Sequence, residues 1–546
     1  MFFSVKAHLL LQLAFHIYAM NEIRVQVEEG KLKGVVVNGC NNVRYLAFRG
    51  IPYAKPPVGE LRFKDPVPAE PWCGERDATK YGNIAVQIDR FTNKVVGDED
   101  CLYLNVYTMK IEPPRKSAVM VWIHGGGYFL GSGNPDWYGP DYIIKKDVVL
   151  VSLNYRLASL GFLNLNDTVI TGNQAVKDAI MALKWIKKNI KAFGGDPEKI
   201  TIFGESAGAS MVHALALSPL AKGLFQKIIA QSGVLLNPWA FNERMDSGFR
   251  LAKKLGKETS DPKVAYEFLK TVDAKTLIEN SLSAIATEEK LSVTLFWTIT
   301  LDNKSSNPVF PEHPKEYIRR GIQIPFLLGF NRDEGIFLIR SNFLENMSDK
   351  DLQKVNDDFK RAILPNVLSM LPKIGITVEE LRYHYFENKE ISEKTLMNYS
   401  YYKGDEFFVR GVRDVVELQK SSGHFKSTYL YHFDYESETS LMRTVLNIGL
   451  PGVSHTEDLG YLFFPEIVKS SNLTCPKPGS NDYKMVNDFV QMWTDFAKTG
   501  NPTPTTNLWL PQTGPQNKDY NYLNIDLNPQ MKIFRYGKER WDWESI

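Results

Sequence analysis

Residues 204–208 read GESAG, the spacing of a serine nucleophile on a sharp turn. In such a turn a strand runs directly into a helix, and glycines two residues either side of the serine permit close packing. An apolar run, 200–203, precedes Ser206, and an alanine-rich stretch follows it. The start of the expected helix would place a partial positive charge near the serine oxygen. The pattern therefore indicates nucleophilic attack on a carbonyl carbon; the alternative is an ordinary glycine-rich turn before a helix.

A second glycine-rich turn, 124–127 (HGGG), follows the apolar run 118–123. Acyl transfer needs backbone N–H donors directed at a developing oxyanion, and consecutive glycines let the backbone approach the substrate closely. The alternatives are a flexible loop or a phosphate cradle. No Lys-Ser/Thr pair follows the glycines, which disfavours a phosphate-binding loop.

The elements that must position these turns alternate between short apolar runs and helical patterns. The clearest helical pattern is 173–193, where apolar residues recur at three- and four-residue steps before a Gly-Gly pair. Alternating strands and helices predict an α/β fold with a mostly parallel sheet covered on both faces, and ligands bind beyond the carboxyl ends of such strands. The expected strands are 118–123, 147–153, 200–203, 224–230, 324–329 and 428–433.

Composition narrows the function further. The 546 residues carry 65 basic and 63 acidic side chains, a net charge of +2, with no run of five like charges, which gives no sign of a nucleic-acid partner. The four cysteines show no zinc spacing, so we expect neither a metal nor another cofactor. A neutral small molecule is the favoured partner, and no stretch predicts a transmembrane helix.

The chain shows no repeat and no linker rich in proline, glycine or serine. Although its length alone favours several domains, we expect a single catalytic domain over residues 20–546. Residues 1–19 are expected to be a leader outside that domain. Their short apolar run fits a secretory signal poorly, so both a signal peptide and an alternative start at Met20 stay open.

The chain resembles the carboxylesterase type B family of the α/β-hydrolases, in particular the insect-type carboxylesterases, over nearly its whole length. The family's fold would be a central, mostly parallel sheet with helices on both faces. The motifs that carry the resemblance are YLAFRGIPYA, EDCLYLNVY, WIHGGGY, NYRLASLGF, GNQAVKDAIMALKWI, FGGDP, FGESAGA and AQSG.

The resemblance implies a Ser–Glu–His catalytic triad. Ser206 is the nucleophile, and Glu334 in 329–335 (GFNRDEG) is the acid, because the family places it directly before the glycine. Asp333 is the rival by chemistry alone. His455 lies on a late glycine-bounded loop and completes the order serine, acid, histidine. A lone loop histidine is otherwise more often structural.

The resemblance also assigns supporting residues. The N–H groups of Gly126, Gly127 and Ala207 would bind the oxyanion, and Trp239 would line the acyl pocket. Glu205 would orient the attacking water, and Ser232 would support the triad acid. The alternatives without a role in catalysis are a core tryptophan for Trp239, a solvated turn residue for Glu205 and a turn hydroxyl for Ser232.

The cysteines depart from the secreted members of the family. Their disulfide ends at the position of Cys101, but its usual partner position, near 85–86, has no cysteine here. We therefore expect largely unpaired cysteines and a cytoplasmic protein, with secretion as the alternative if residues 1–19 act as a signal peptide.

Three functions remain open. The first is a broad-specificity carboxylesterase for lipophilic or xenobiotic esters, and the second is a specialised hydrolase of the juvenile hormone esterase or cholinesterase type. Glu205 stands where juvenile hormone esterases typically have Gln, and Phe91 stands where cholinesterases have a tryptophan, so both specialised forms are weakened. The third is a non-catalytic or slow protein that sequesters organophosphates or similar esters.

Overall fold

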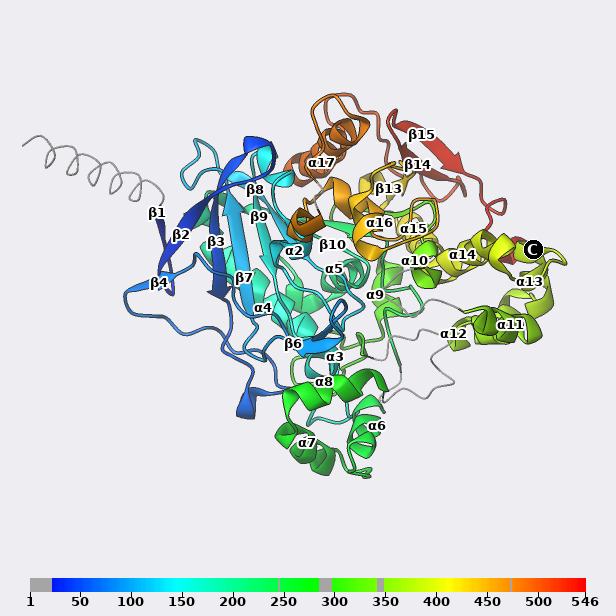
Figure 1. Cartoon of the computed structure of the whole chain (residues 1–546), viewed down its shortest axis with the longest axis horizontal. Helices are drawn as coiled ribbons and strands as arrows, with labels where there is room; N and C mark the ends of the chain where they lie inside the picture. Colours follow the sequence, from blue (N-terminus) through cyan, green and yellow to red (C-terminus); the bar gives the residue numbers. More distant parts are fainter. Residues whose placement is uncertain (1–21, 244–245, 284–296, 341–347, 472–473) are drawn as a thin grey trace, which may run out of the picture.

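The chain folds around one 13-stranded sheet (Figure 1). The computed structural model describes residues 22–243, 246–283, 297–340, 348–471 and 474–546, so the expected leader, 1–19, lies outside the described residues. The strand order is β1-β2-β3-β7-β9-β8-β10-β11-β12-β13-β14-β15, and β4 pairs with β2. Every neighbouring pair from β9 to β14 is parallel, whereas the edges formed by β1, β2, β3, β7 and β15 are antiparallel. The expected mostly parallel α/β sheet is confirmed.

The observed strands lie within about two residues of most expected positions. The largest difference is β10, which begins at Gly195, before the expected run 200–203. The strands of the main sheet are β1 Glu22–Val27, β2 Gly30–Asn38, β3 Arg44–Pro52, β4 Glu75–Asp77, β7 Tyr103–Thr108, β8 Ser117–Ile123, β9 Val148–Leu153, β10 Gly195–Glu205, β11 Lys227–Gln231, β12 Phe326–Asn331, β13 Thr428–Phe433, β14 Tyr520–Ile525 and β15 Gln530–Phe534. A separate hairpin joins β5 Gln87–Asp89 and β6 Lys94–Val96.

Helices fill the connections between strands and extend beyond the sheet (Figure 1). The expected helix at 173–193 is present as α4, Gln174–Asn189, followed by a 3-10 turn. The remaining α-helices are α2 Pro135–Tyr138, α3 Ala158–Phe162, α5 Ala207–Leu217, α6 Ser247–Lys254, α7 Pro262–Thr271, α8 Ala274–Ser283, α9 Pro314–Arg320, α10 Ile336–Ile339, α11 Asp349–Asp357, α12 Pro365–Met370, α13 Val378–Phe386, α14 Leu396–Gly404, α15 Arg410–Ser421, α16 Leu441–Leu446 and α17 Asn481–Thr499. A π-helical turn, η10 Asp405–Val409, joins α14 to α15.

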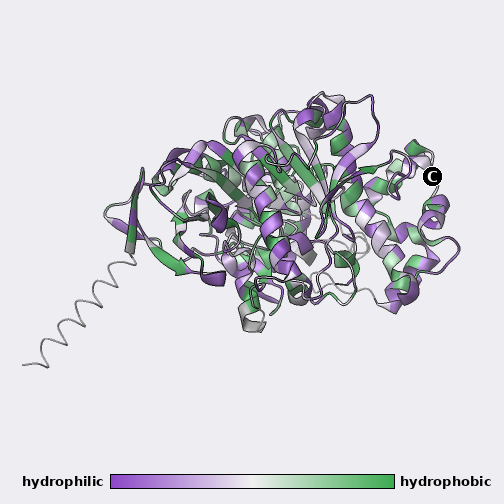
Figure 2. Ribbon diagram, turned by 90° about the horizontal axis from the view of Figure 1, so that it is seen from above, coloured by the Kyte–Doolittle hydropathy of each residue, from purple (hydrophilic) through white to green (hydrophobic). Residues whose placement is uncertain are grey.

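The central strands divide their side chains between two cores. In β8, Val119 and Val121 face the core that includes α4 and α5, whereas Met120 and Trp122 face the core that includes α17. This alternation follows from the two-residue period of a strand and leaves both faces covered. Figure 2 shows hydrophobic residues along the inner strands and hydrophilic residues over much of the outer surface. The single domain over 20–546 stays a prediction, and the sheet supports it by joining strands from both ends of the chain.

One disulfide corrects the expectation that the cysteines are largely unpaired. Cys40 and Cys475 are bonded, with Cα atoms 6.0 Å apart, and join the β2–β3 connection to the segment before α17. No spacing rule pairs cysteines that lie 435 positions apart in a sequence. Cys73 is free and exposed, and Cys101 is free and buried. Across the described ranges, no helix is both long and apolar enough to span a bilayer.

Candidate active site

Ser206 stands on a strained turn between β10 and α5. Its backbone has φ 58° and ψ −124°, a region that non-glycine residues adopt only where the surrounding structure holds them. A Cβ at Gly204 would lie 2.6 Å from the carbonyl oxygen of Ile123, and a Cβ at Gly208 only 2.1 Å from it. The glycines two residues either side of Ser206 are therefore required by close backbone packing against β8.

Glu334 follows β12 and forms a short hydrogen bond with His455. Its Oε2 lies 2.6 Å from Nδ1 of His455. Its Oε1 accepts from the Ser232 hydroxyl at 2.5 Å and from the Asn331 N–H at 2.7 Å. Both Glu334 and His455 are buried, so this pair acts in a region of low dielectric constant. The hydroxyl of Ser232 thus contacts the expected triad acid directly.

The carboxylate of Asp333, the residue before Glu334, has other hydrogen-bond partners than His455. Its carboxylate accepts from the Arg332 guanidinium at 2.8 Å and from the Val453 N–H at 2.9 Å. These contacts hold the two loops behind the histidine together. The structure therefore places Glu334, and not Asp333, against His455.

Glu205 lies on the opposite side of the imidazole. Its Oε1 is 3.0 Å from Nε2 of His455, but the approach is too poorly aligned to count as a hydrogen bond. Burial raises the pKa of Glu205, because a charged carboxylate is costly away from water. Burial alone would lower the pKa of His455, but Glu205 and Glu334 outweigh it and raise that pKa to about 10.

Ser206 and His455 line the same cavity, and within the described residues no hydrogen bond joins them. The imidazole nitrogen that would accept the serine proton instead faces Glu205. Catalytic hydrogen bonds often tighten only when substrate binds, so this arrangement is compatible with a nucleophile and its base.

The glycine-rich loop leaves two backbone donors available beside Ser206. Gly126 and Gly127 adopt φ 102° and 60°, and the Gly126 carbonyl accepts from the N–H groups of Phe129 and Leu130. Among the described residues, no hydrogen bond uses the N–H of Gly126 or Gly127. The N–H of Ala207 begins α5, where the first turn has no intrahelical acceptor. All three sequence-predicted oxyanion donors thus belong to the two turns that meet at Ser206.

The cavity above Ser206 has a volume of about 870 Å³, part of it open to solvent, and its wall is mostly apolar. Trp239 lines it and donates its indole N–H to the Phe407 carbonyl at 2.8 Å. Sequence reasoning missed most of the remaining wall, because its members come from separate segments without a motif. These missed residues include Arg90, Trp137, Tyr138, Phe337, Phe407 and Phe408.

Phe91, the residue at the cholinesterase tryptophan position, is 51% exposed. It stacks on Trp137 with ring centroids 6.2 Å apart, and Trp137 rather than Phe91 lines the cavity. Within the described part of the chain, no group of three His, Cys, Asp or Glu side chains is placed to hold a metal ion.

The sheet order, the strand-turn-helix at Ser206 and the acid after β12 define an α/β-hydrolase. A model of the carboxylesterase family matches residues 21–541, so the chain belongs to that family and is a carboxylic ester hydrolase. Juvenile hormone esterase of Tribolium castaneum is 35% identical over 94% of this chain and 88% of its own length. Esterase FE4 of Myzus persicae is 34% identical over 90% of this chain and 87% of its own.

A crystal structure is also similar to this chain. It is that of juvenile hormone esterase from Manduca sexta with OTFP covalently attached, at a TM-score of 0.83 and 28% sequence identity. The match covers 96% of this chain and 98% of that chain. The resemblance to insect esterases and the expected α/β-hydrolase fold are both confirmed.

Proposed function

We propose that Ser206, Glu334 and His455 form the catalytic triad of this ester hydrolase. The observation that carries the proposal is the buried Glu334–His455 pair, whose histidine lines the same cavity as Ser206 on its strained turn. His455 Nε2 takes the proton of Ser206 as Oγ attacks the ester carbonyl, and Glu334 stabilises the imidazolium that forms.

The collapse of the first tetrahedral intermediate breaks the bond to the alcohol, which leaves with the proton from His455. Water then attacks the acyl-enzyme, again losing its proton to His455, and the carboxylic acid and free Ser206 are released. The N–H groups of Gly126, Gly127 and Ala207 bind both oxyanions, each donor contributing about 3–4 kcal/mol. Glu205, next to Nε2, would orient the water, and Trp239 would contact the acyl group.

We propose lipophilic esters as the substrates, with broad specificity as the first candidate. The support is the mostly apolar cavity, in which aromatic rings outnumber charged groups. Such a wall recognises shape and apolar area, which discriminates weakly between similar esters. Xenobiotic carboxylic esters fall within this class, whereas organophosphates belong to the sequestering alternative.

A juvenile-hormone-esterase-like enzyme is the second candidate. Two of the similar proteins reported above bear that name, one from a sequence comparison and one from a structure comparison. A panel assay separates the two candidates: kcat/KM is measured for juvenile hormone and for p-nitrophenyl esters of increasing acyl length. A value for juvenile hormone about 100-fold above the whole panel would favour the specialised enzyme, and comparable values would favour the broad one.

Ser206→Ala tests the mechanism and the sequestering alternative together. We expect the variant to lose hydrolysis of p-nitrophenyl acetate by about 10⁴-fold or more with its fold intact. A variant that keeps wild-type turnover would exclude Ser206 as the nucleophile. In the wild-type protein, a stoichiometric burst without further turnover would identify a sequestering protein instead.

We also propose that the protein works in an oxidising compartment. The Cys40–Cys475 disulfide supports this location, because cytosolic thiols are kept reduced. The cytoplasmic expectation rested on unpaired cysteines and loses that support. Secretion is tested by expressing the full chain in insect cells and assaying the medium and the cell lysate.

A further inference from the structure

The π-helical turn η10, between α14 and α15, forms one wall of the active-site cavity. It carries Phe407 and Phe408, both of which line the cavity. The ring of Phe408 stacks on the imidazole of His455, with centroids 4.2 Å apart and planes at 28°. A π-helical turn is rare, occurs mostly as a single turn inside an α-helix, and is frequently found at functional sites.

Backbone carbonyls of η10 also fix the neighbouring wall. The Phe407 carbonyl accepts from the indole of Trp239 at 2.8 Å, and the amide of Asn237 donates to the carbonyls of both Phe407 and Phe408 at 2.8 Å. A Cβ at Gly411, in the next turn, would lie 2.5 Å from the Asn237 amide nitrogen. The turn therefore positions Trp239 through direct contact.

The helix that contains η10 also packs against the loop of Glu334, the proposed triad acid. A Cβ at Gly335, the residue after Glu334, would lie 1.9 Å from the Ser400 carbonyl of α14 and 2.6 Å from the Gly404 nitrogen. The α14–η10–α15 helix consequently meets three parts of the site: the acid loop, the imidazole of His455 and the wall at Trp239. A shift of this helix would move all three.

The C-terminal segment, 535–545, holds η10 at both of its ends. At the start, the buried Asp405 accepts from Arg540 through Nε at 2.6 Å and Nη2 at 3.0 Å, and from the Tyr385 hydroxyl at 2.6 Å. Directly after the end, Arg410 donates to the Trp541 carbonyl at 2.7 Å and to Glu544 at 2.9 Å.

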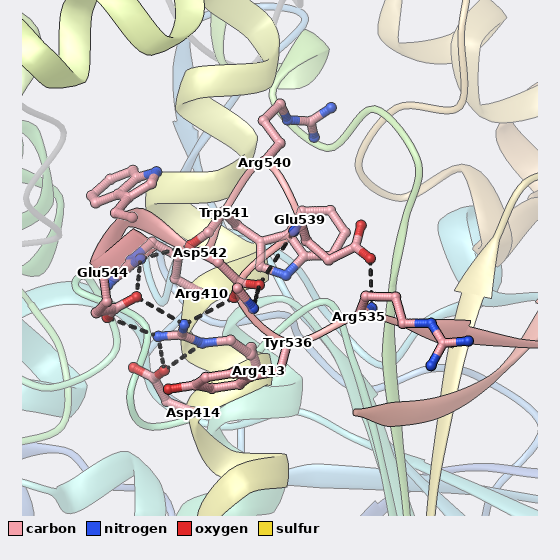
Figure 3. A network of polar contacts seen from close by, with 12 residues as sticks. Arg410, Arg413, Asp414, Arg535, Tyr536, Glu539, Arg540, Trp541, Asp542 and Glu544 are labelled. Carbon is pink, nitrogen blue, oxygen red and sulfur yellow. Dashed lines mark hydrogen bonds and ion pairs between the residues drawn. The ribbon is translucent and has the colours of Figure 1, made fainter. Parts of the chain in front are cut away.

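A second arginine of α15 also contacts the C-terminal segment. Arg413, one turn beyond Arg410 in α15, pairs with Asp542 and Glu544. Figure 3 shows Arg410 and Arg413 directed at the C-terminal segment. The chain terminus lies beside α13 and α14 in Figure 1.

We propose that the C-terminal segment is a positioning element of the active site, with Arg540 and Asp405 as positioning residues that set Phe408 against His455 and thereby fix the acyl-chain preference. Neither residue lines the cavity, so both act through η10. A paired guanidinium and carboxylate suit this task, because two parallel hydrogen bonds fix orientation as well as distance. The proposal rests on the proposed triad, since it requires His455 to be the catalytic base.

The first experiment compares Arg540→Met with the matched control Arg535→Met. Arg535 belongs to the same segment but pairs with Asp519 on the surface, away from η10. kcat and KM are measured for p-nitrophenyl acetate, butyrate and octanoate. We expect Arg540→Met to change kcat/KM unequally, by about 3-fold or more between acetate and octanoate, and to change KM as well as kcat. The control should leave the profile unchanged.

A merely structural role would give a different result. If Arg540→Met only lowers the folded fraction, kcat falls by the same factor for every ester and KM stays constant, which would overturn the proposal. Arg540→Lys, which keeps the charge but not the paired geometry, serves as the milder variant if Arg540→Met does not fold. It should shift the profile in the same direction by a smaller factor, and an unchanged profile would again overturn the proposal.

A double-mutant cycle provides the second test. Arg540→Met is combined with Phe408→Leu, and the change in kcat/KM for octanoate is compared with the product of the single effects. We expect the change in the double variant to differ from that product by about 3-fold or more, because the C-terminal segment acts through the Phe408 ring. Effects that multiply within about 2-fold would refute that coupling. Failure of the triad proposal would instead appear as full activity in Ser206→Ala, so the two failures are distinguishable.

Discussion

Replacing Glu205 by Gln isolates the electrostatic effect of one carboxylate on the proposed general base. Oε1 of Glu205 lies 3.0 Å from Nε2 of His455, and both side chains are almost fully buried. Gln keeps the size of the side chain but removes its negative charge. The imidazolium then loses one of its two stabilising carboxylates, so the pKa of His455 falls. In the free enzyme His455 is then neutral, and able to act as a base, at a lower pH. The acidic limb of the kcat/KM profile, where activity rises as His455 loses its proton, therefore moves to lower pH.

The separation sets the size of the shift. At 3.0 Å the Coulomb attraction is about 1.4 kcal/mol in bulk water and about 5.5 kcal/mol at an effective dielectric constant of about 20. One pKa unit equals about 1.4 kcal/mol, so these limits correspond to shifts of about one and about four units. Glu205 and His455 both line a cavity that is partly open to solvent, so we expect a shift nearer the lower limit, of about one to two units.

The assay follows p-nitrophenyl acetate hydrolysis from about pH 5 to about pH 11, a range that includes the pKa of about 10 of His455, with spontaneous hydrolysis subtracted and the product read at its isosbestic wavelength. Glu457→Gln is the matched control, because Glu457 is a buried carboxyl two residues from His455 that makes no contact with its ring. The acidic limb of Glu457→Gln should stay within about 0.3 pH unit of the wild-type limb. An acidic limb that Glu205→Gln leaves in place, or moves to higher pH, would refute the assignment of Glu205 as the group that raises the pKa of His455.

Three further predictions concern the loop, the buried carboxyl and the disulfide. Gly126→Ala should lower kcat by about 100-fold, because a Cβ would lie 2.1 Å from the Leu130 carbonyl oxygen and displace an oxyanion donor. The same clash, at a backbone φ of 102°, should also lower the Tm. A kcat within about 3-fold of wild type would contradict this role. Burial raises the pKa of Glu457 to about 7, so the folded state loses stability as pH rises from about 4.3 to about 7. Glu457→Gln should therefore raise the free energy of unfolding by about 3–4 kcal/mol at pH 8 but little at pH 4. Cys40→Ser should lower the Tm by removing a cross-link to Cys475 that contributes about 3 kcal/mol, whereas Cys73→Ser should leave the Tm unchanged; equal Tm values for both variants would contradict the disulfide.

The parts of this fold that sequence predicts are those in which chemistry fixes the local backbone. The turn at Ser206 requires glycines at fixed offsets, so 204–208 was informative without any structure. The strand β13 was predicted at its observed bounds, Thr428–Phe433, because a β-branched and aromatic run between polar residues has one simple interpretation. Asp333 and Glu334 could not be separated by chemistry, since both are carboxylates on one turn, and only the fold decides which one faces His455.

The parts that sequence did not predict depend on long-range contacts. Phe408 reaches His455 only because a π-helical turn adds a residue to an otherwise continuous helix, and 405–409 contains no helix breaker that would mark the change. The Cys40–Cys475 bond joins the two ends of the domain, where no periodicity relates the partners. Both features arise from how distant elements pack, which a local pattern does not encode.

The two carboxylates that flank His455 differ in the hydrogen bonds of the oxygens nearest the imidazole, and this difference favours separate roles for them. Glu334 receives the Ser232 hydroxyl, the Asn331 N–H and the imidazole, so its position is fixed by three donors. Oε1 of Glu205 has no aligned donor, although it lies as close to the ring as a hydrogen bond allows. A fixed acceptor on Nδ1 orients the imidazole through the whole reaction. A carboxylate oxygen that contacts Nε2 without an aligned hydrogen bond can yield that nitrogen to Ser206 when substrate enters. His455 can therefore serve as the base for Ser206 although its Nε2 faces Glu205 in the free protein.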